Sequence, residues 1–249
     1  VLSTSVELQL GIELPVAITN ISGNAEEGSQ LVSNKEQILN HHQCQVEIDI
    51  ADSKYDITSN YEYIRGTGSI PIIDYNPRNE NLSKQALQQR GYNQNGWPFS
   101  PCGLLTRPNG FDKDRQRLSF CCFKQCLHLN RKALEELQSR YNISSCPHIQ
   151  NHSGYVHHSS LEDHPRIINE IPRGSKLYGT IKKLRSASER SNSSLKDDLK
   201  ILDHPRVMSS TRAAILAQMA AIVLLLKRAF SFIVRITILS KKFLHSKDP

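Results

Sequence analysis

The sequence predicts an α/β fold, because strand-like and helix-like runs alternate along its first third. Runs of alternating polar and apolar residues lie on either side of a turn at residues 11–15, which is typical of a β-hairpin. Apolar residues then recur at helical spacing, and two β-rich runs follow with a helical run between them. The expected strands are 3–10, 15–21, 46–51 and 69–75, and the expected helices are 26–42 and 59–65.

The rest of the chain divides into two regions of different character. The first holds five of the six cysteines and seven of the eleven prolines, with one helix-like run at 130–141, so we interpret it as a Cys-rich insertion. The second predicts two long helices, 182–202 and 210–243, separated by a proline. The predicted organisation is 1–76 as the first part of the core, 77–173 as the insertion and 174–249 as helices that complete the core.

The composition describes a core-forming chain with a basic surface. Of its 249 residues 38% are hydrophobic, and 31 Lys and Arg against 24 Asp and Glu give a net charge of +7. This balance favours polyanionic partners such as nucleic acid. The longest apolar run, 213–226, is too short to span a bilayer comfortably, so we expect no membrane partner. Without a visible secretory signal, the cysteines predict reduced thiols or a metal site in the cytoplasm.

Several enzyme classes lack their characteristic motifs in this sequence. The segment Gly66-Thr-Gly68 is followed by strand-like sequence and not by a helix, so it is not a phosphate-binding loop. The sequence contains neither a G-x-S-x-G nor an H-E-x-x-H motif. Kinase, hydrolase and zincin functions are therefore disfavoured.

Two acidic residues stand out as candidates for chemistry. Asp52 follows a short apolar strand, and the carboxyl ends of strands are where open α/β sheets place their ligands, although it could equally cap the next segment. In the predicted helix 182–202, Arg185, Glu189 and Lys196 fall within about 40° of each other at about 100° per residue. This stripe borders the apolar face of the helix, but a solvated Arg–Glu pair is the simpler alternative.

The segments around these residues resemble the second and third acidic motifs of bacterial insertion-sequence DDE transposases. Asp52-Ser-Lys-Tyr-Asp56 follows a strand, and the Arg185-x3-Glu189-x6-Lys196 spacing matches the YREK signature of that family. The resemblance implies a ribonuclease H-like mixed sheet flanked by helices. It also implies that Asp52 and Glu189 are catalytic ligands of Mg²⁺ or Mn²⁺, and that the partner is DNA at transposon ends, bound by a homodimer near the bacterial nucleoid. The implied DNA-contacting residues are Arg185, Lys196, Lys183 and Arg190.

The chain departs from the family pattern at three positions. Lys182 replaces the signature Tyr, with Tyr178 one turn earlier, and Lys54 replaces a small residue. The first catalytic Asp of the family lies on a strand before the hairpin, whereas no Asp precedes Asp49 here. We therefore expect the first, central strand of the sheet to be missing from the sequence given. Two-metal cleavage should then fall by several orders of magnitude.

The cysteines of the insertion suggest an alternative function. Cys102, Cys122, Cys126 and Cys146, with His128 or His148 in reserve, could hold a tetrahedral zinc ion, although buried reduced thiols are the simpler interpretation. A non-catalytic nucleic-acid-binding protein with a zinc-bound insertion is thus the alternative to a transposase. The histidine-rich stretch 148–164 is expected to be a solvated loop.

Overall fold

The computed structural model describes residues 1–21, 26–42, 45–80, 91–162, 164–200 and 209–245. The chain divides into two compact units. The first, here called the terminal unit, combines Val1–Gln45 with Lys183–Pro249, and the second, the central unit, is Val46–Lys182. Each unit is described separately.

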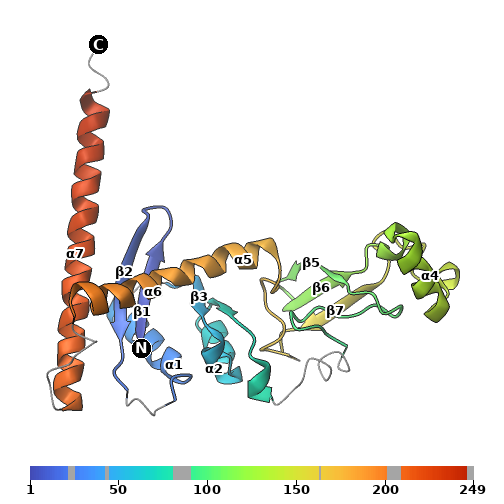
Figure 1. The fold of residues 1–249 in the computed structure, drawn as a ribbon, viewed down its shortest axis with the longest axis horizontal. Helices are drawn as coiled ribbons and strands as arrows, with labels where there is room; N and C mark the ends of the chain where they lie inside the picture. The colour runs from blue at the N-terminus through green and yellow to red at the C-terminus, as the bar shows by residue number, and fades with distance from the viewer. Residues whose placement is uncertain (22–25, 43–44, 81–90, 163, 201–208, 246–249) are drawn as a thin grey trace. The chain divides into compact units, whose positions relative to one another are not determined.

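The terminal unit begins with the predicted hairpin. Strands β1 (Leu2–Glu7) and β2 (Ile12–Ile18) pair antiparallel, and Gly11 adopts a φ of +60° in the turn between them. Helix α1 (Gln30–His42) follows, and its buried Asn34 donates to the Ser3 hydroxyl over 2.9 Å. The predicted strands and helix in this region are confirmed (Figure 1).

The predicted helix 182–202 is confirmed only in part. In the terminal unit its 3₁₀ turn η5 (Lys183–Arg185) leads into α6 (Ser186–Ser193), which becomes a π-helical turn, η6 (Ser194–Asp198). Regular α-helical geometry thus stops within a run of Ser and Asn residues, which are poor helix formers. Because a π-turn has a different angular step, the predicted stripe is not continuous as far as Lys196.

Helix α7 (Ser210–His245) is the second predicted C-terminal helix. Its Ala220 and Leu224 pack with Leu195 in one buried cluster. Arg228 and Arg235 donate to the backbone of the hairpin, at Glu13 O (3.1 Å) and Leu10 O (2.8 Å). These contacts hold α7 against the hairpin. Within the described residues, no helix combines the length and apolar character needed to cross a bilayer.

The central unit begins with a strand–helix–strand segment, as predicted. Strands β3 (Ile48–Ala51) and β4 (Ile70–Ile73) pair in parallel, with Ile50 opposite Ile72, and α2 (Thr58–Gly66) connects them. Fully buried Ile64 and Ile72 form part of the core. In the described chain this pair and the hairpin are separate two-stranded sheets. The observed fold class is therefore mixed α/β with small sheets.

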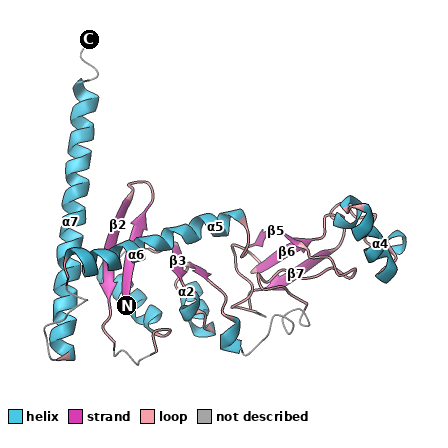
Figure 2. Ribbon diagram, viewed as in Figure 1, coloured by secondary structure: helices cyan, strands magenta, loops and turns pink. Residues whose placement is uncertain are grey.

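The Cys-rich insertion contains a sheet that the sequence did not predict. Strands β5 (Arg107–Asp112), β6 (Arg117–Cys121) and β7 (Val156–Ser160) form an antiparallel sheet in that order (Figure 2). A cluster of buried residues, Leu118, Phe120, Leu161, Ile167 and Ile168, packs at this sheet. Helix α4 (Arg131–Arg140) matches the predicted helix.

The expectation of a histidine-rich loop was wrong for two residues. His157 and His158 lie in β7, where they pair with Phe120 and Ser119 of β6. Burial lowers the pKa of His157, which therefore favours its neutral form. The strand is stabilised by pairing with β6, more than thirty residues earlier, and this partner is invisible in a local pattern.

Candidate functional site

The two parallel strands of the central unit both end in an aspartate. Asp52 follows β3 and Asp74 follows β4. Asp52 is half-buried, and its Oδ1 accepts a hydrogen bond from the Lys54 amide over 2.9 Å. The capping role considered for Asp52 is therefore present in the structure. This cap lies at the strand end where a ligand site was predicted.

A cavity of about 650 Å³ lies beside these strand ends. Its lining includes Ser53, Asp74 and, from helix α5 (Lys176–Lys182), Tyr178 and Lys182. The Lys182 ammonium forms an ion pair with Asp74, with 2.7 Å between Nζ and Oδ2. Lys182, at the position where the resembled YREK signature has Tyr, thus forms an ion pair with Asp74, which follows β4.

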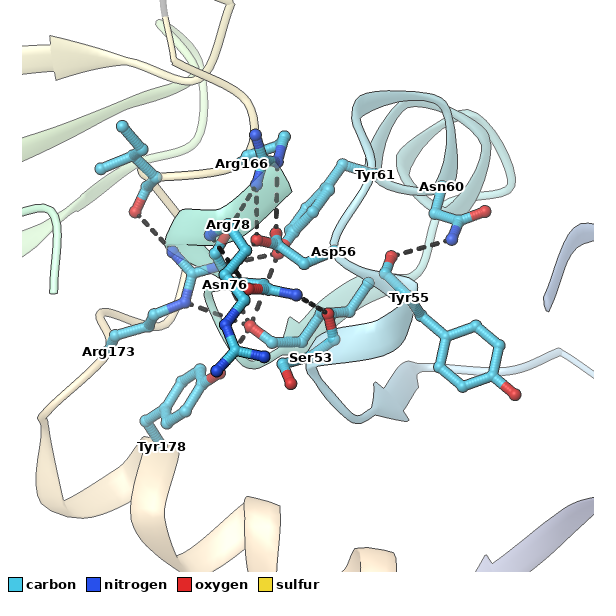
Figure 3. A network of polar contacts seen from close by, with 12 residues as sticks. Ser53, Tyr55, Asp56, Asn60, Tyr61, Asn76, Arg78, Arg166, Arg173 and Tyr178 are labelled. Carbon is cyan, nitrogen blue, oxygen red and sulfur yellow. Dashed lines mark hydrogen bonds and ion pairs between the residues drawn. The ribbon is translucent and has the colours of Figure 1, made fainter. Parts of the chain in front are cut away.

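A buried carboxylate lies one turn beyond Asp52. Asp56 is fully buried and accepts hydrogen bonds from the Tyr61 hydroxyl (2.7 Å) and the Asn76 amide (2.6 Å) (Figure 3). Arg166 forms an ion pair with it over 2.7 Å, and the Arg166 side chain is only 9% exposed. These contacts compensate a charge that burial would otherwise make very costly.

Arg173 connects the partners of Asp56 to strand β4. Its guanidinium donates to the carbonyl oxygens of Ile73 (3.0 and 3.1 Å) and Ile167 (2.9 Å), and to the Tyr61 hydroxyl (2.6 Å). The buried Tyr178 hydroxyl donates to the same Ile73 carbonyl over 2.9 Å. Burial raises the pKa of both Tyr61 and Tyr178, so both phenols remain protonated donors. Tyr178 therefore has a structural contact inside the central unit.

Glu189 lies on α6 of the terminal unit, whereas Asp52 belongs to the central unit. The Glu189 side chain is 57% exposed and forms an ion pair with Arg185, one helical turn earlier. This is the i,i+4 pair weighed as the simpler interpretation of the motif. Lys183 and Lys196 are exposed, and Arg190 donates to both carboxylate oxygens of Glu13 and to the Ser186 hydroxyl.

Two glutamates of the hairpin, Glu13 and Glu7, have contacts within the terminal unit. The hydrogen bonds from Arg190 lower the pKa of Glu13 below the usual 4.5. Glu7, on the same hairpin, accepts a hydrogen bond from the Gln9 amide. An ion pair with an arginine on α6 gives Glu13 a structural role, since that arginine occupies both oxygens.

This ion pair predicts a pH-dependent contribution to stability. Because the folded-state pKa of Glu13 is lowered, the contribution is complete above about pH 4.5 and is lost as the pH falls through the folded-state value. We expect Glu13→Gln to lower the free energy of unfolding by at most about 1 kcal/mol at neutral pH, since the pair is near the surface. Urea unfolding between about pH 3 and 7 measures this difference. Glu7→Gln is the control, and a Glu13→Gln difference that persists at low pH would contradict the assignment.

The four cysteines considered for zinc all lie in the insertion. Burial raises the pKa of the Cys126 thiol, and the neighbouring thiols of Cys102, Cys122 and Cys146 raise it further. All four are free thiols. Among the described residues, however, no group of three or more His, Cys, Asp or Glu side chains is already arranged around an ion.

Sequence reasoning missed several residues of the central unit. Asp74 ends a β-rich run just as Asp52 does, so the strand-end rule that singled out Asp52 applies to it as well. Asp56, Arg166 and Arg173 have no such signal, because their partners lie far away in the sequence.

The chain was compared with known proteins. No protein-family model, curated protein or solved structure matches it.

Proposed function

We propose that the chain is the catalytic part of a DDE transposase, which cleaves and joins DNA by metal-dependent phosphoryl transfer. The observation that carries this proposal is the position of Asp52 at the carboxyl end of β3, within a parallel strand–helix–strand segment. Glu189 follows on a helix after the insertion, with Arg185 and Lys196 at the signature spacing. The order of elements supports the resemblance of the motifs.

The carboxylates fit the metal that such a reaction needs. Mg²⁺ and Mn²⁺ prefer hard oxygen ligands, which Asp52 and Glu189 offer from a half-buried and an exposed position. When bound, the metal activates the attacking oxygen and stabilises the leaving oxygen. In this proposal Asp52 holds the ion at the strand end. Glu189 exchanges its ion pair with Arg185 for the ion, and Arg185 contacts a DNA phosphate.

The metal assignment can be tested by cleavage of the protein itself. Fe²⁺ bound in place of Mg²⁺, with ascorbate and peroxide, cuts the backbone near its ligands. We expect cuts close to both Asp52 and Glu189 in the presence of DNA, suppressed by excess Mg²⁺ and lost in both Asp52→Asn and Glu189→Gln. The matched control is Glu135→Gln, an exposed helical glutamate that also pairs with an arginine one turn away. Cuts near neither residue, in protein that still binds DNA, would contradict the proposal.

The same proposal predicts weak catalysis by the sequence given. With the first carboxylate absent, Mg²⁺- or Mn²⁺-dependent nicking of supercoiled DNA should be slower by several orders of magnitude than with a complete triad. Nicking at ordinary transposase rates that disappears in Glu189→Ala would show that two carboxylates suffice.

The second candidate is a non-catalytic nucleic-acid-binding protein. It is favoured by one observation, namely that Glu189 and Asp52 both have structural contacts, with Arg185 and with the Lys54 amide. For this candidate we expect salt-dependent DNA binding that neither Mg²⁺ nor the Glu189→Gln substitution changes. For a transposase we expect Mg²⁺ to strengthen DNA binding, and Glu189→Gln to abolish that increase.

A further inference from the structure

The outer part of the insertion has almost no apolar core. From residue 122 to residue 155 only Ile143 and Gly154 are buried, and α4 has no buried residue. Segments that bury so little apolar surface usually need a disulfide or a metal to hold one conformation. The cysteines here are free thiols, so no disulfide supplies this constraint.

Four free thiols come from three segments of this region. Cys102 lies in a turn, Cys122 directly follows β6, Cys126 lies in the 3₁₀ turn η3 (Gln125–His128), and Cys146 caps η4 (Ile143–Ser145). The Gln125 side chain donates to Leu105 O over 2.9 Å and so ties the turn of Cys126 to the segment that follows Cys102.

The backbone between Cys122 and Cys126 is held in an unusual conformation. Phe123 and Lys124 have positive φ angles of 46° and 52°, which non-glycine residues rarely adopt. Hydrogen bonds from the amides of Cys122 and Phe123 to Tyr155 O and Ser153 O, both 3.0 Å, hold this turn. Gly154 approaches so closely that an added Cβ would lie 2.5 Å from the Cys122 sulfur. The turn therefore keeps two cysteines close together at the cost of backbone strain.

Polar groups already contact two of the sulfur atoms. The Tyr155 amide donates to Cys122 Sγ over 3.1 Å, and the Ser100 hydroxyl lies 3.1 Å from Cys102 Sγ. Donors of this kind stabilise the negative charge that thiolates retain when they bind a metal. The His148 ring, two residues after Cys146, packs edge-on against the Tyr155 ring with 5.1 Å between the centroids, and so ties the Cys146 segment to the Cys122 turn.

We propose that Cys102, Cys122, Cys126 and Cys146 bind one structural Zn²⁺ ion, which holds the outer part of the insertion together. Zn²⁺ is bound in closed structural sites by four thiolates in tetrahedral geometry. Binding replaces four S–H bonds with four S–Zn bonds and releases four protons, with no change of oxidation state. Among the described residues no such group of thiolates is already arranged around an ion, so binding requires the four sulfur atoms to move to ligand distance. This inference does not depend on the proposed DNA chemistry.

The test uses the full chain purified without chelator. We expect about one zinc per chain by elemental analysis, and Co²⁺ in its place should give the intense visible absorption of a tetrahedral thiolate site. Affinity should rise with pH, because a thiol must lose its proton to bind the ion. After chelation, proteolysis within residues 122–155 should become about tenfold faster or more, while β5–β7 stay protected.

Matched variants separate a site from general thiol chemistry. Cys126→Ser should lower the zinc content about tenfold or more, whereas Cys121→Ala should retain it. Cys121 is adjacent to Cys122 but fully buried in β6, where it is not one of the four. Zinc content well below one per chain in freshly purified protein would overturn the proposal. Equal zinc content in Cys126→Ser and Cys121→Ala would do the same.

Discussion

Replacing Arg166 with methionine is expected to destabilise the central unit by about 3–5 kcal/mol, which exceeds the effect expected for any surface ion pair. The substitution removes the guanidinium that lies 2.7 Å from the carboxylate of Asp56, a residue with no exposed surface. Tyr61 and Asn76 also donate to this carboxylate, but from neutral groups, whose hydrogen bonds are weaker than those from a guanidinium.

Denaturant unfolding, compared at constant slope, measures this loss. The control is Arg131→Met, which removes a pair between two exposed side chains of α4 and should cost about 0.5 kcal/mol or less. In the double variant Asp56→Leu and Arg166→Met, the unpaired charge is absent, so much of the stability should return. A single Arg166→Met variant as stable as the wild type would contradict the stabilising role of the Arg166–Asp56 pair.

The second large effect concerns DNA binding. If three or four of the basic residues Arg185, Lys196, Lys183 and Arg190 contact phosphates, the dissociation constant for duplex DNA should rise about 100-fold between about 50 and 200 mM salt. The reason is that each neutralised phosphate releases a condensed counterion, and more salt makes that release less favourable. Fluorescence anisotropy with a labelled duplex over a salt series measures the slope.

Single substitutions divide this slope among the four residues. Lys183→Ala and Lys196→Ala should each reduce it by about 1, whereas Lys132→Ala on the exposed surface of α4 should leave it unchanged. Arg190→Ala should have a smaller effect than Lys183→Ala, because Glu13 already neutralises Arg190. An affinity that does not change with salt would contradict a phosphate-binding surface on this segment.

The contrast between the hairpin and the insertion indicates what could be predicted. The hairpin, α1, β3, α2 and β4 follow local patterns of apolar spacing and turn residues, and all of them are present. The sheet of the insertion escaped prediction because β5 and β7 are mostly polar strands, and β7 pairs with β6 over a long range in sequence. The helix bearing Glu189 was predicted, but its π-turn was not, because a hydrophobic pattern specifies a period and not a change of hydrogen-bond register.

The candidate residues follow the same division. The sequence by itself determined that Asp52 ends a strand, that Glu189 is followed seven residues later by Lys196, and that four cysteines lie within one insertion. Only the tertiary structure decided that Arg166 pairs with Asp56 and that Arg173 donates to β4, each about a hundred residues earlier in the sequence. It also decided that Glu13 forms an ion pair with Arg190. A charged side chain can be paired, capped or left in water with the same neighbours in sequence. Which of these occurs depends on the partner that folding brings within hydrogen-bonding distance, because the energy of a charge is set by its burial and its nearest opposite charge.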